Sequence, residues 1–145
     1  MIVRPATPAD RGAVIAMASR FIEETAYRAW PATEEHLGEL FDLAHVHGVI
    51  FLAEDQGWIL GMLAIVVVPH LLTERLYAEE LCWWVNPAVR GGLAAPRLLE
   101  AAEQFTRQRG LSCLKMVQPA DQPTVGRLYS RRGFRPVEVA FVKEW

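Results

Sequence analysis

Two apolar runs separated by a three-residue turn constrain the fold of this chain more than any other feature. Residues 49–54 (VIFLAE) and 58–68 (WILGMLAIVVV) have strand-like composition, and the Asp55-Gln56-Gly57 segment between them is typical of a tight hairpin. A third strand-like run, residues 76–85 (LYAEELCWWV), follows a loop that begins at Pro69. The middle of the chain is therefore predicted to form three hairpin-connected strands.

Helical patterns precede these strands. A short strand at residues 2–4 leads into a predicted helix over about 8–22, in which apolar residues recur at helical spacing. A second helix is predicted to open at Thr33 and to end at Gly48. The loop at 23–33 carries aromatic side chains that would either line an acceptor pocket or pin the loop to the core.

The second half of the chain alternates helices and strands. A helix ending at Arg109-Gly110 is followed by a strand at 112–117, a short helix at 121–132 with an aspartate N-cap, and one or two closing strands in 134–145. This order predicts an α+β fold, an α/β sandwich in which a mixed, mostly antiparallel sheet of six to seven strands carries helices on both faces. At 145 residues the chain is predicted to form a single domain, 1–145.

Charge and cysteine content exclude several classes of function. A net charge of −2 provides no basic field for nucleic acid or for an anionic membrane surface. Cys82 and Cys113 are isolated thiols, which are typical of a reducing compartment, and the N-terminus has no apolar signal segment, so a cytoplasmic location is expected. No metal is expected, because the histidines lack the spacing of a metal site: His36, His45, His47 and His70.

Residues 83–99 (WWVNPAVRGGLAAPRLL) begin as a strand and end as a helix. Unpaired N–H groups at a helix N-terminus attract anions, Gly91 and Gly92 let a ligand approach the backbone, and Arg90 adds a positive charge. Two interpretations of this stretch are about equally supported by its residues alone. One is a phosphate-binding site, and the other is a turn that needs glycine only for packing.

A second motif lies further along the chain, LYSRRGF at residues 128–134. Together, VNPAVRGGLAAPRLL and LYSRRGF resemble the GNAT superfamily of acyl-CoA-dependent N-acetyltransferases, in which V-x-P and R-x-x-G-x-G/A precede a helix and L-Y-x-x-x-G-F follows. The opening VRPATPAD and the predicted element order extend the resemblance over essentially the whole chain. The paired tryptophans before V-x-P and the closing GFRPVE and VKEW segments are most similar to compact members encoded by phages.

The resemblance implies positions for acetyl-CoA. The backbone near Trp83, Trp84 and Val85 would bind the pantetheine arm, acting almost as another strand. The following turn would hold the pyrophosphate and comprises Arg90, Gly91, Gly92, Leu93, Ala94 and Ala95. Two residues depart from the family pattern. Leu93 stands where a glycine is usual, unless the loop is one residue shorter, and Gln122 replaces an asparagine that usually contacts the cofactor.

The resemblance also implies an acid and a base. Tyr129 would protonate the departing coenzyme A thiolate, although a Leu-Tyr pair in an amphipathic helix is otherwise usually core packing. A carboxylate on the fourth strand would take the proton of the amine, and the candidates Glu79 and Glu80 point to opposite faces. Residue parity puts Glu79 on the face of Trp83, whereas the bulge that is usual in the family would swap that parity.

The predicted function is acetyl-CoA-dependent transfer of an acetyl group to a primary amine, on a small molecule or a protein, by direct attack in a ternary complex. The alternative is a non-catalytic acyl-CoA-binding or interaction module on the same fold. The acceptor would depend on the loops at 23–33 and 69–75 and on the C-terminal strands. An apolar strand edge near the C-terminus is compatible with a homodimer.

Overall fold

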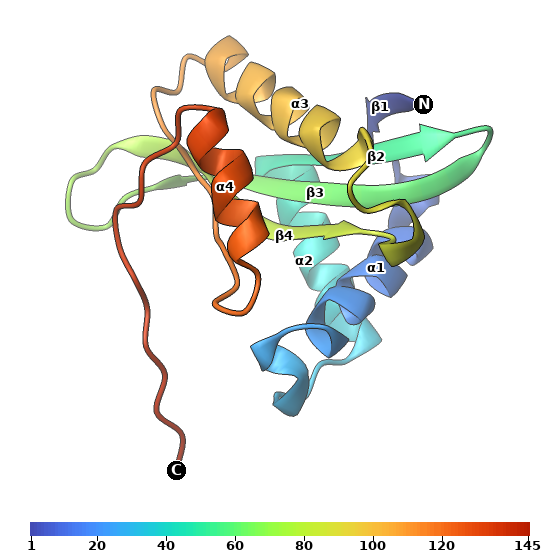
Figure 1. Cartoon of the computed structure of the whole chain (residues 1–145), viewed down its shortest axis with the longest axis horizontal. Helices are drawn as coiled ribbons and strands as arrows, with labels where there is room; N and C mark the ends of the chain where they lie inside the picture. Colours follow the sequence, from blue (N-terminus) through green and yellow to red (C-terminus); the bar gives the residue numbers. More distant parts are fainter.

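The computed structural model describes residues 1–145 and shows a five-stranded sheet with helices on both faces (Figure 1). The strands lie side by side in chain order and are β1 (Ile2–Pro5), β2 (Gly48–Asp55), β3 (Trp58–Pro69), β4 (Leu76–Val85) and β5 (Leu114–Lys115). Neighbouring strands from β1 to β4 are antiparallel, and β5 joins β4 in parallel. The predicted α+β fold with a mixed, mostly antiparallel sheet is confirmed.

The hairpin between β2 and β3 forms where the sequence predicts it. Gln56 (φ 49°) and Gly57 (φ 82°) occupy the two central positions of the turn with positive φ, as in a two-residue type I′ hairpin. Asp55 pairs directly with Trp58, so the turn closes without further loop residues.

Two pairs of helices cover the two faces of the sheet (Figure 1). One face carries α1 (Arg11–Glu23) and α2 (Glu34–His47), and the core of this α1–α2 face includes Val14, Met17, Phe41, Ala44, Leu52 and Met62. The other face carries α3 (Ala94–Gln108) and α4 (Pro123–Arg131), and the core of this α3–α4 face includes Leu63, Ile65, Ala78, Ala94, Leu98 and Ala102. The predicted helices on both faces are therefore confirmed.

The ends of the helices follow from short-range signals, with one exception. The Thr33 hydroxyl caps α2 by accepting a hydrogen bond from the His36 N–H, and α2 ends at Gly48 as predicted. The predicted helix over 8–22 starts as a 3₁₀ turn at Pro8–Asp10 and becomes α1 only at Arg11. The aspartate N-cap predicted for the last helix is wrong, because Gln122 holds that position and α4 begins at the next residue, a proline.

The sheet has five strands rather than the six to seven predicted, and the difference lies in the C-terminal part of the chain. Residues 134–145 leave α4 as an extended tail (Figure 1). β5 is confined to two residues within the predicted 112–117, because β4 and β5 part after Glu79 pairs with Lys115. Because β5 is so short, its edge offers few backbone N–H and C=O groups to a closing strand. Phe134 is the last residue whose N–H donates to a backbone carbonyl.

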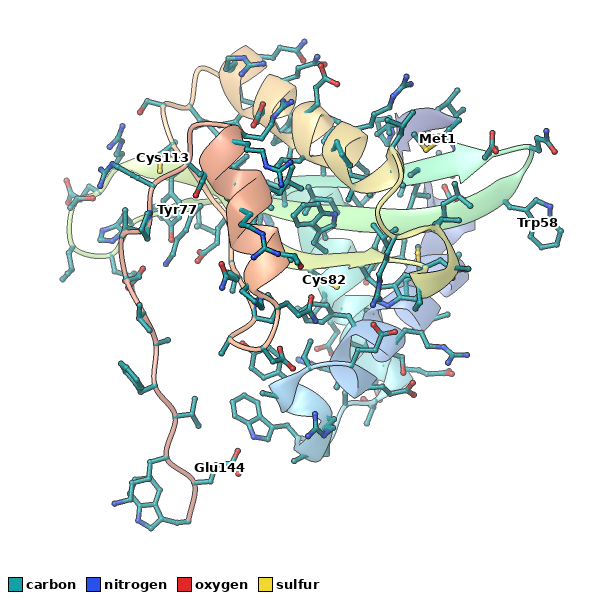
Figure 2. All side chains as sticks on the ribbon, in the orientation of Figure 1. Met1, Trp58, Tyr77, Cys82, Cys113 and Glu144 are labelled. Carbon is teal, nitrogen blue, oxygen red and sulfur yellow. The ribbon has the colours of Figure 1, made fainter.

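The two cysteines lie on separate segments of the chain and are both free (Figure 2). Cys82 packs against the core of the α1–α2 face, and burial raises the pKa of its thiol. It therefore behaves as a small apolar side chain. No helix in the structure combines the length and the apolar composition that crossing a membrane requires.

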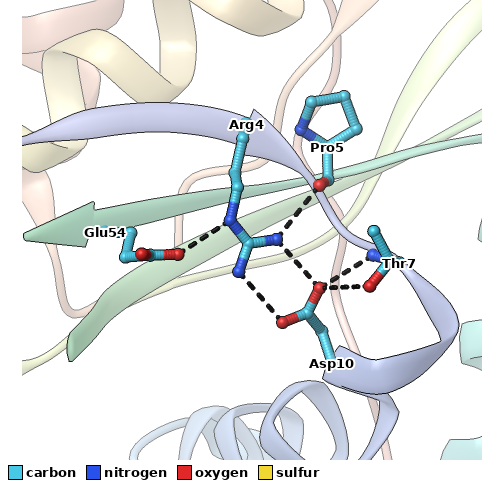
Figure 3. A network of polar contacts seen from close by, with 5 residues as sticks. All are labelled: Arg4, Pro5, Thr7, Asp10 and Glu54. Carbon is cyan, nitrogen blue, oxygen red and sulfur yellow. Dashed lines mark hydrogen bonds and ion pairs between the residues drawn. The ribbon is translucent and has the colours of Figure 1, made fainter. Parts of the chain in front are cut away.

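A partly buried ion-pair network connects β1 to the segment that starts α1 (Figure 3). The Arg4 guanidinium donates to both oxygens of Asp10, at 2.9 and 3.0 Å, and its Nε donates to Glu54 at 2.7 Å. Asp10 also accepts hydrogen bonds from the backbone N–H and the hydroxyl of Thr7, at 2.8 and 3.0 Å. The bonds from Arg4 and Thr7 hold the pKa of Asp10 well below its usual range.

Asp10→Asn is expected to lower the free energy of unfolding at pH 7 by about 2–3 kcal/mol, because charge-assisted hydrogen bonds to a buried carboxylate are lost. The wild-type advantage should shrink as the pH falls below the ordinary carboxyl pKa of 3.8, because the unfolded chain then takes up a proton that the folded chain, with its lowered pKa, does not. Urea unfolding at pH 7 and pH 3 measures both effects. Asp42→Asn, which breaks an exposed ion pair with Arg11, is the control and should change stability by less than about 0.5 kcal/mol. Equal changes in the free energy of unfolding for Asp10→Asn and Asp42→Asn would contradict a stabilising role for the Asp10 network.

Candidate active site

A β-bulge in β4 decides which side chains of this strand share a face. Ala64 of β3 pairs with Cys82 and the next residue, Ile65, pairs with Glu80, so Leu81 is an extra residue in β4. Before the bulge, Ala78 lies in the core of the α3–α4 face, and after it Trp83 packs against that same core. The alternation of strand side chains therefore puts Glu80, rather than Glu79, on the face of Trp83.

Glu80 meets Tyr129 of α4 at the point where β4 and β5 diverge. The Tyr129 hydroxyl donates to the Val117 carbonyl at 2.7 Å and lies 3.4 Å from Glu80 Oε2. The Val117 N–H donates to the same Glu80 oxygen at 2.9 Å. A strand, a helix and the segment after β5 thus bring a phenol and a carboxylate within one hydrogen bond of each other.

The surroundings adjust the protonation of both groups. Burial raises the pKa of Glu80 from its ordinary 4.5 to about 7, against the opposing hydrogen bonds from Val117 and Tyr129. Burial and the neighbouring Glu80 charge raise the pKa of Tyr129 above its usual range. At neutral pH the phenol is therefore protonated, and the carboxylate is close to the midpoint between its two forms.

Glu79, the other carboxylate predicted from the sequence, lies in a different set of contacts. It accepts a hydrogen bond from the Tyr77 hydroxyl at 2.8 Å and lies 3.4 Å from the Lys115 ammonium. Lys115 also pairs with Glu138 of the tail at 2.6 Å. Glu79 therefore belongs to an ion-pair cluster beside β5 and makes no hydrogen bond with Tyr129.

The turn between β4 and α3 exposes backbone donors. A 3₁₀ turn at Pro87–Val89 is followed by Gly91, whose positive φ of 87° is readily adopted only by glycine. α3 begins at Ala94 with Leu93 in the N-cap position. The N–H groups without a protein acceptor are those of Gly91, Leu93, Ala94 and Ala95. The Leu93 side chain is 64% exposed, so it points to solvent and does not fill the turn.

Arg90 is held by the protein itself. Its Nε donates to the Val85 carbonyl at 2.8 Å, and its Nη2 is hydrogen-bonded to Glu24 just after α1. Glu24 also accepts a hydrogen bond from the Trp84 indole at 3.1 Å. The guanidinium therefore fastens the turn to the end of β4 and to α1, while the backbone N–H groups of the turn stay free.

Comparison with known proteins identifies the family. The family model for GNAT acetyltransferases matches residues 15–134. This chain belongs to the GNAT family.

Related proteins agree with this assignment. A protein of Azospirillum brasilense named IAA acetyltransferase is 35% identical over 105 residues, which cover 72% of this chain and 66% of that protein. The match thus spans just under two thirds of the relative's length. A predicted acetyltransferase of Clostridium acetobutylicum, solved with acetyl-CoA, superposes with a TM-score of 0.80 at 17% identity, over 99% of this chain and 95% of that one. The aminoglycoside antibiotic 6′-N-acetyltransferase of Acinetobacter haemolyticus gives a TM-score of 0.75 at 20% identity, over 100% and 99%.

The remaining residues predicted for the GNAT site lie on different sides of β4 or at the start of α4. Trp84 packs on the α1–α2 face, whereas the Trp83 ring lies 5.9 Å from the Tyr129 ring on the opposite face. Val85 is buried at the end of β4. Gln122 is the half-buried N-cap residue of α4, and its side chain makes no capping hydrogen bond.

Two residues of this GNAT chain near the site escaped the sequence analysis. Glu24 contacts Arg90 and Trp84, which lie 66 and 60 positions further along the sequence. Gln118 packs against Gly126 of α4 so closely that a Cβ there would lie 1.9 Å from its Oε1. Neither contact has a local signal, because each depends on how distant elements are packed.

Proposed function

We propose that this chain is an acetyl-CoA-dependent N-acetyltransferase formed by one domain over residues 1–145, with Tyr129 as the acid and Glu80 as the base. The observation that carries the proposal is the contact of 3.4 Å between a protonated phenol and a carboxylate where β4 and β5 part. A base with a pKa of about 7 and an acid that keeps its proton suit proton transfer near neutral pH.

The residues around this contact fit acetyl-CoA. The four free N–H groups from Gly91 to Ala95 suit a pyrophosphate at the start of α3, and the outward Leu93 side chain leaves them accessible. β4 pairs with β5 only at Ala78 and Glu79, so its edge from Trp83 to Val85 has no partner strand. Apart from the Val85 carbonyl, which accepts from Arg90, this edge suits the backbone contacts of a pantetheine arm. Arg90 acts as a positioning residue for the turn, through Glu24 and the Val85 carbonyl.

The chemistry follows from these positions. Acetyl-CoA supplies the acetyl group as a thioester. Glu80 accepts the proton that an ammonium acceptor must lose before its nitrogen can attack the thioester carbon. A C–N bond forms, the C–S bond breaks with its electron pair passing to sulfur, and Tyr129 gives that sulfur a proton. The attacking nitrogen, which becomes cationic as the C–N bond forms, loses its second proton, and that proton restores the Tyr129 phenol. Holding amine and thioester together in a ternary complex is worth roughly 7–11 kcal/mol in well-oriented systems, and no acyl-enzyme is needed.

The acceptor is a primary amine on a small molecule or a protein. The name of the structurally similar Acinetobacter enzyme, a 6′-N-acetyltransferase for an aminoglycoside, supports an amine nitrogen as the target.

The first test is thermal unfolding with and without acetyl-CoA, because a ligand that binds the folded state raises Tm by mass action. Thiol release with a panel of amines then measures transfer. No rise in Tm at saturating acetyl-CoA would contradict the proposal, and a rise without thiol release for any amine would indicate a binding module.

We also propose that the protein forms a homodimer through its tail. Residues 135–145 make no backbone hydrogen bonds, and their exposed apolar side chains are Val137, Val139, Phe141, Val142 and Trp145. The tail contacts the rest of the chain through Glu138, which pairs with Lys115, and through Glu144, which accepts from the Trp30 indole at 2.8 Å. A second copy has the same tail and the same short β5 edge, so a dimer with twofold symmetry would give the tail and the β5 edge of each copy a partner. Sedimentation should give a dimer for the full chain and a monomer for a chain ending at Phe134. If both chains sedimented as monomers, the proposed dimer would be contradicted.

A further inference from the structure

Trp83 carries a buried hydrogen-bond donor that the protein leaves unpaired. Its Nε1 is the one buried side-chain nitrogen or oxygen in the structure for which the chain supplies no partner. Leaving such a donor unpaired costs about 1–3 kcal/mol. The neighbouring Trp84 differs, because its Nε1 donates to Glu24 at 3.1 Å. Two adjacent indoles thus have opposite hydrogen-bonding states.

The position of Trp83 relates it to the proposed acetyl-CoA site. Its ring lies 5.9 Å from the Tyr129 ring on the α3–α4 face. Along β4 it stands three residues after Glu80, but because Leu81 is an extra residue the two pair with Leu63 and Ile65 of β3, about 7 Å apart at the usual strand rise. The turn with the free N–H groups begins just beyond Val85. A ligand held at the turn and reacting beside Tyr129 must therefore extend along β4 past Trp83.

We propose that the Trp83 indole N–H donates a hydrogen bond to an amide carbonyl of the pantetheine arm of coenzyme A. An indole nitrogen only donates, so its partner must be an acceptor, and the arm carries amide carbonyls that lose water when they enter this site. The bond satisfies the orphaned donor and the desolvated carbonyl together. This inference rests on the proposed function and adds a side-chain contact to the backbone contacts of β4.

The test compares Trp83→Phe with Trp58→Phe by calorimetric titration of coenzyme A. Both substitutions replace an indole with a phenyl ring, but Trp58 is 77% exposed at the start of β3, outside the proposed site, so only the first removes a buried unpaired donor. Trp83→Phe is expected to raise Kd about fivefold, which is the value of one neutral hydrogen bond. Trp58→Phe is expected to change Kd less than twofold.

A second titration uses 3′,5′-ADP, which keeps the nucleotide end of coenzyme A and lacks the arm. Its affinity should be the same for wild type and Trp83→Phe, which also shows that the variant is folded. Equal coenzyme A affinity in wild type and Trp83→Phe would overturn the inference, as would an equal loss of affinity for both ligands. In either case a wild type that binds coenzyme A leaves the proposed function standing, whereas a wild type that binds neither ligand contradicts the proposed function itself.

Discussion

Tyr129→Phe is expected to lower kcat by about 10²–10³-fold while the Kd for acetyl-CoA stays within twofold. The magnitude is that of a general acid removed from a thiolate leaving group. The phenyl ring keeps the contacts of the tyrosine with Trp83 and Phe134, whose ring centroids lie 5.9 and 5.5 Å away, so packing is preserved. Steady-state thiol release and calorimetric titration measure the two quantities.

Tyr77→Phe is the matched control for this substitution. Tyr77 also donates its phenol to a glutamate, Glu79, at 2.8 Å, but it lies outside the contact between Glu80 and Tyr129. Its removal should leave kcat within twofold of wild type. If Tyr129→Phe turned over as fast as Tyr77→Phe, the phenol of Tyr129 would have no role as the acid.

Glu80→Gln is expected to lower kcat by about 10²–10³-fold at pH 8 and to remove the acid limb of the pH–rate profile. In the wild type the rate should rise as the pH increases through about 7, because the base must be ionised and burial raises the pKa of Glu80 to that value. The deficit of the variant should shrink as the pH approaches the pKa of the acceptor amine, where the free base becomes abundant. Glu79→Gln is the control and should keep the wild-type profile. A profile unchanged by Glu80→Gln would assign the base elsewhere.

Glu80→Gln is also expected to change how the stability of the protein depends on pH. Because the pKa of Glu80 is raised on folding, the folded chain keeps a proton that the unfolded chain loses between pH 4.5 and about 7. Wild-type stability should therefore fall as the pH rises through this window and then level off. Glu80→Gln should flatten this dependence and be the more stable protein at pH 8 relative to wild type. Thermal unfolding at pH 5 and pH 8 measures the difference.

Features with a local physical cause could be predicted from the sequence. The hairpin at Gln56-Gly57 needs two residues that tolerate positive φ, and the cap at Thr33 needs only a hydroxyl three residues from an N–H. Tyr129 as the acid and a carboxylate of the fourth strand as the base were predicted from the resemblance, as was the bulge that sets the face of Glu80. Parity alone would have chosen Glu79.

Features that depend on distant packing could not be predicted. The apolar alternation of the tail indicates a strand, yet a strand also needs a partner edge, and the two-residue β5 does not offer one. Arg90 has the charge expected of a phosphate ligand, but nothing near it in sequence indicates that Glu24 holds its guanidinium. The exposure of Leu93 likewise depends on where α3 begins.

Because of the bulge at Leu81, the number of residues in β4 determines which carboxylate lies beside Tyr129. Two adjacent glutamates have the same chemistry, and one inserted residue determines which of them faces α4. Deleting Leu81 would leave both side chains in the chain while exchanging their faces relative to Trp83. When this strand is aligned with that of a relative, the placement of a one-residue gap therefore decides which glutamate is matched to a catalytic position.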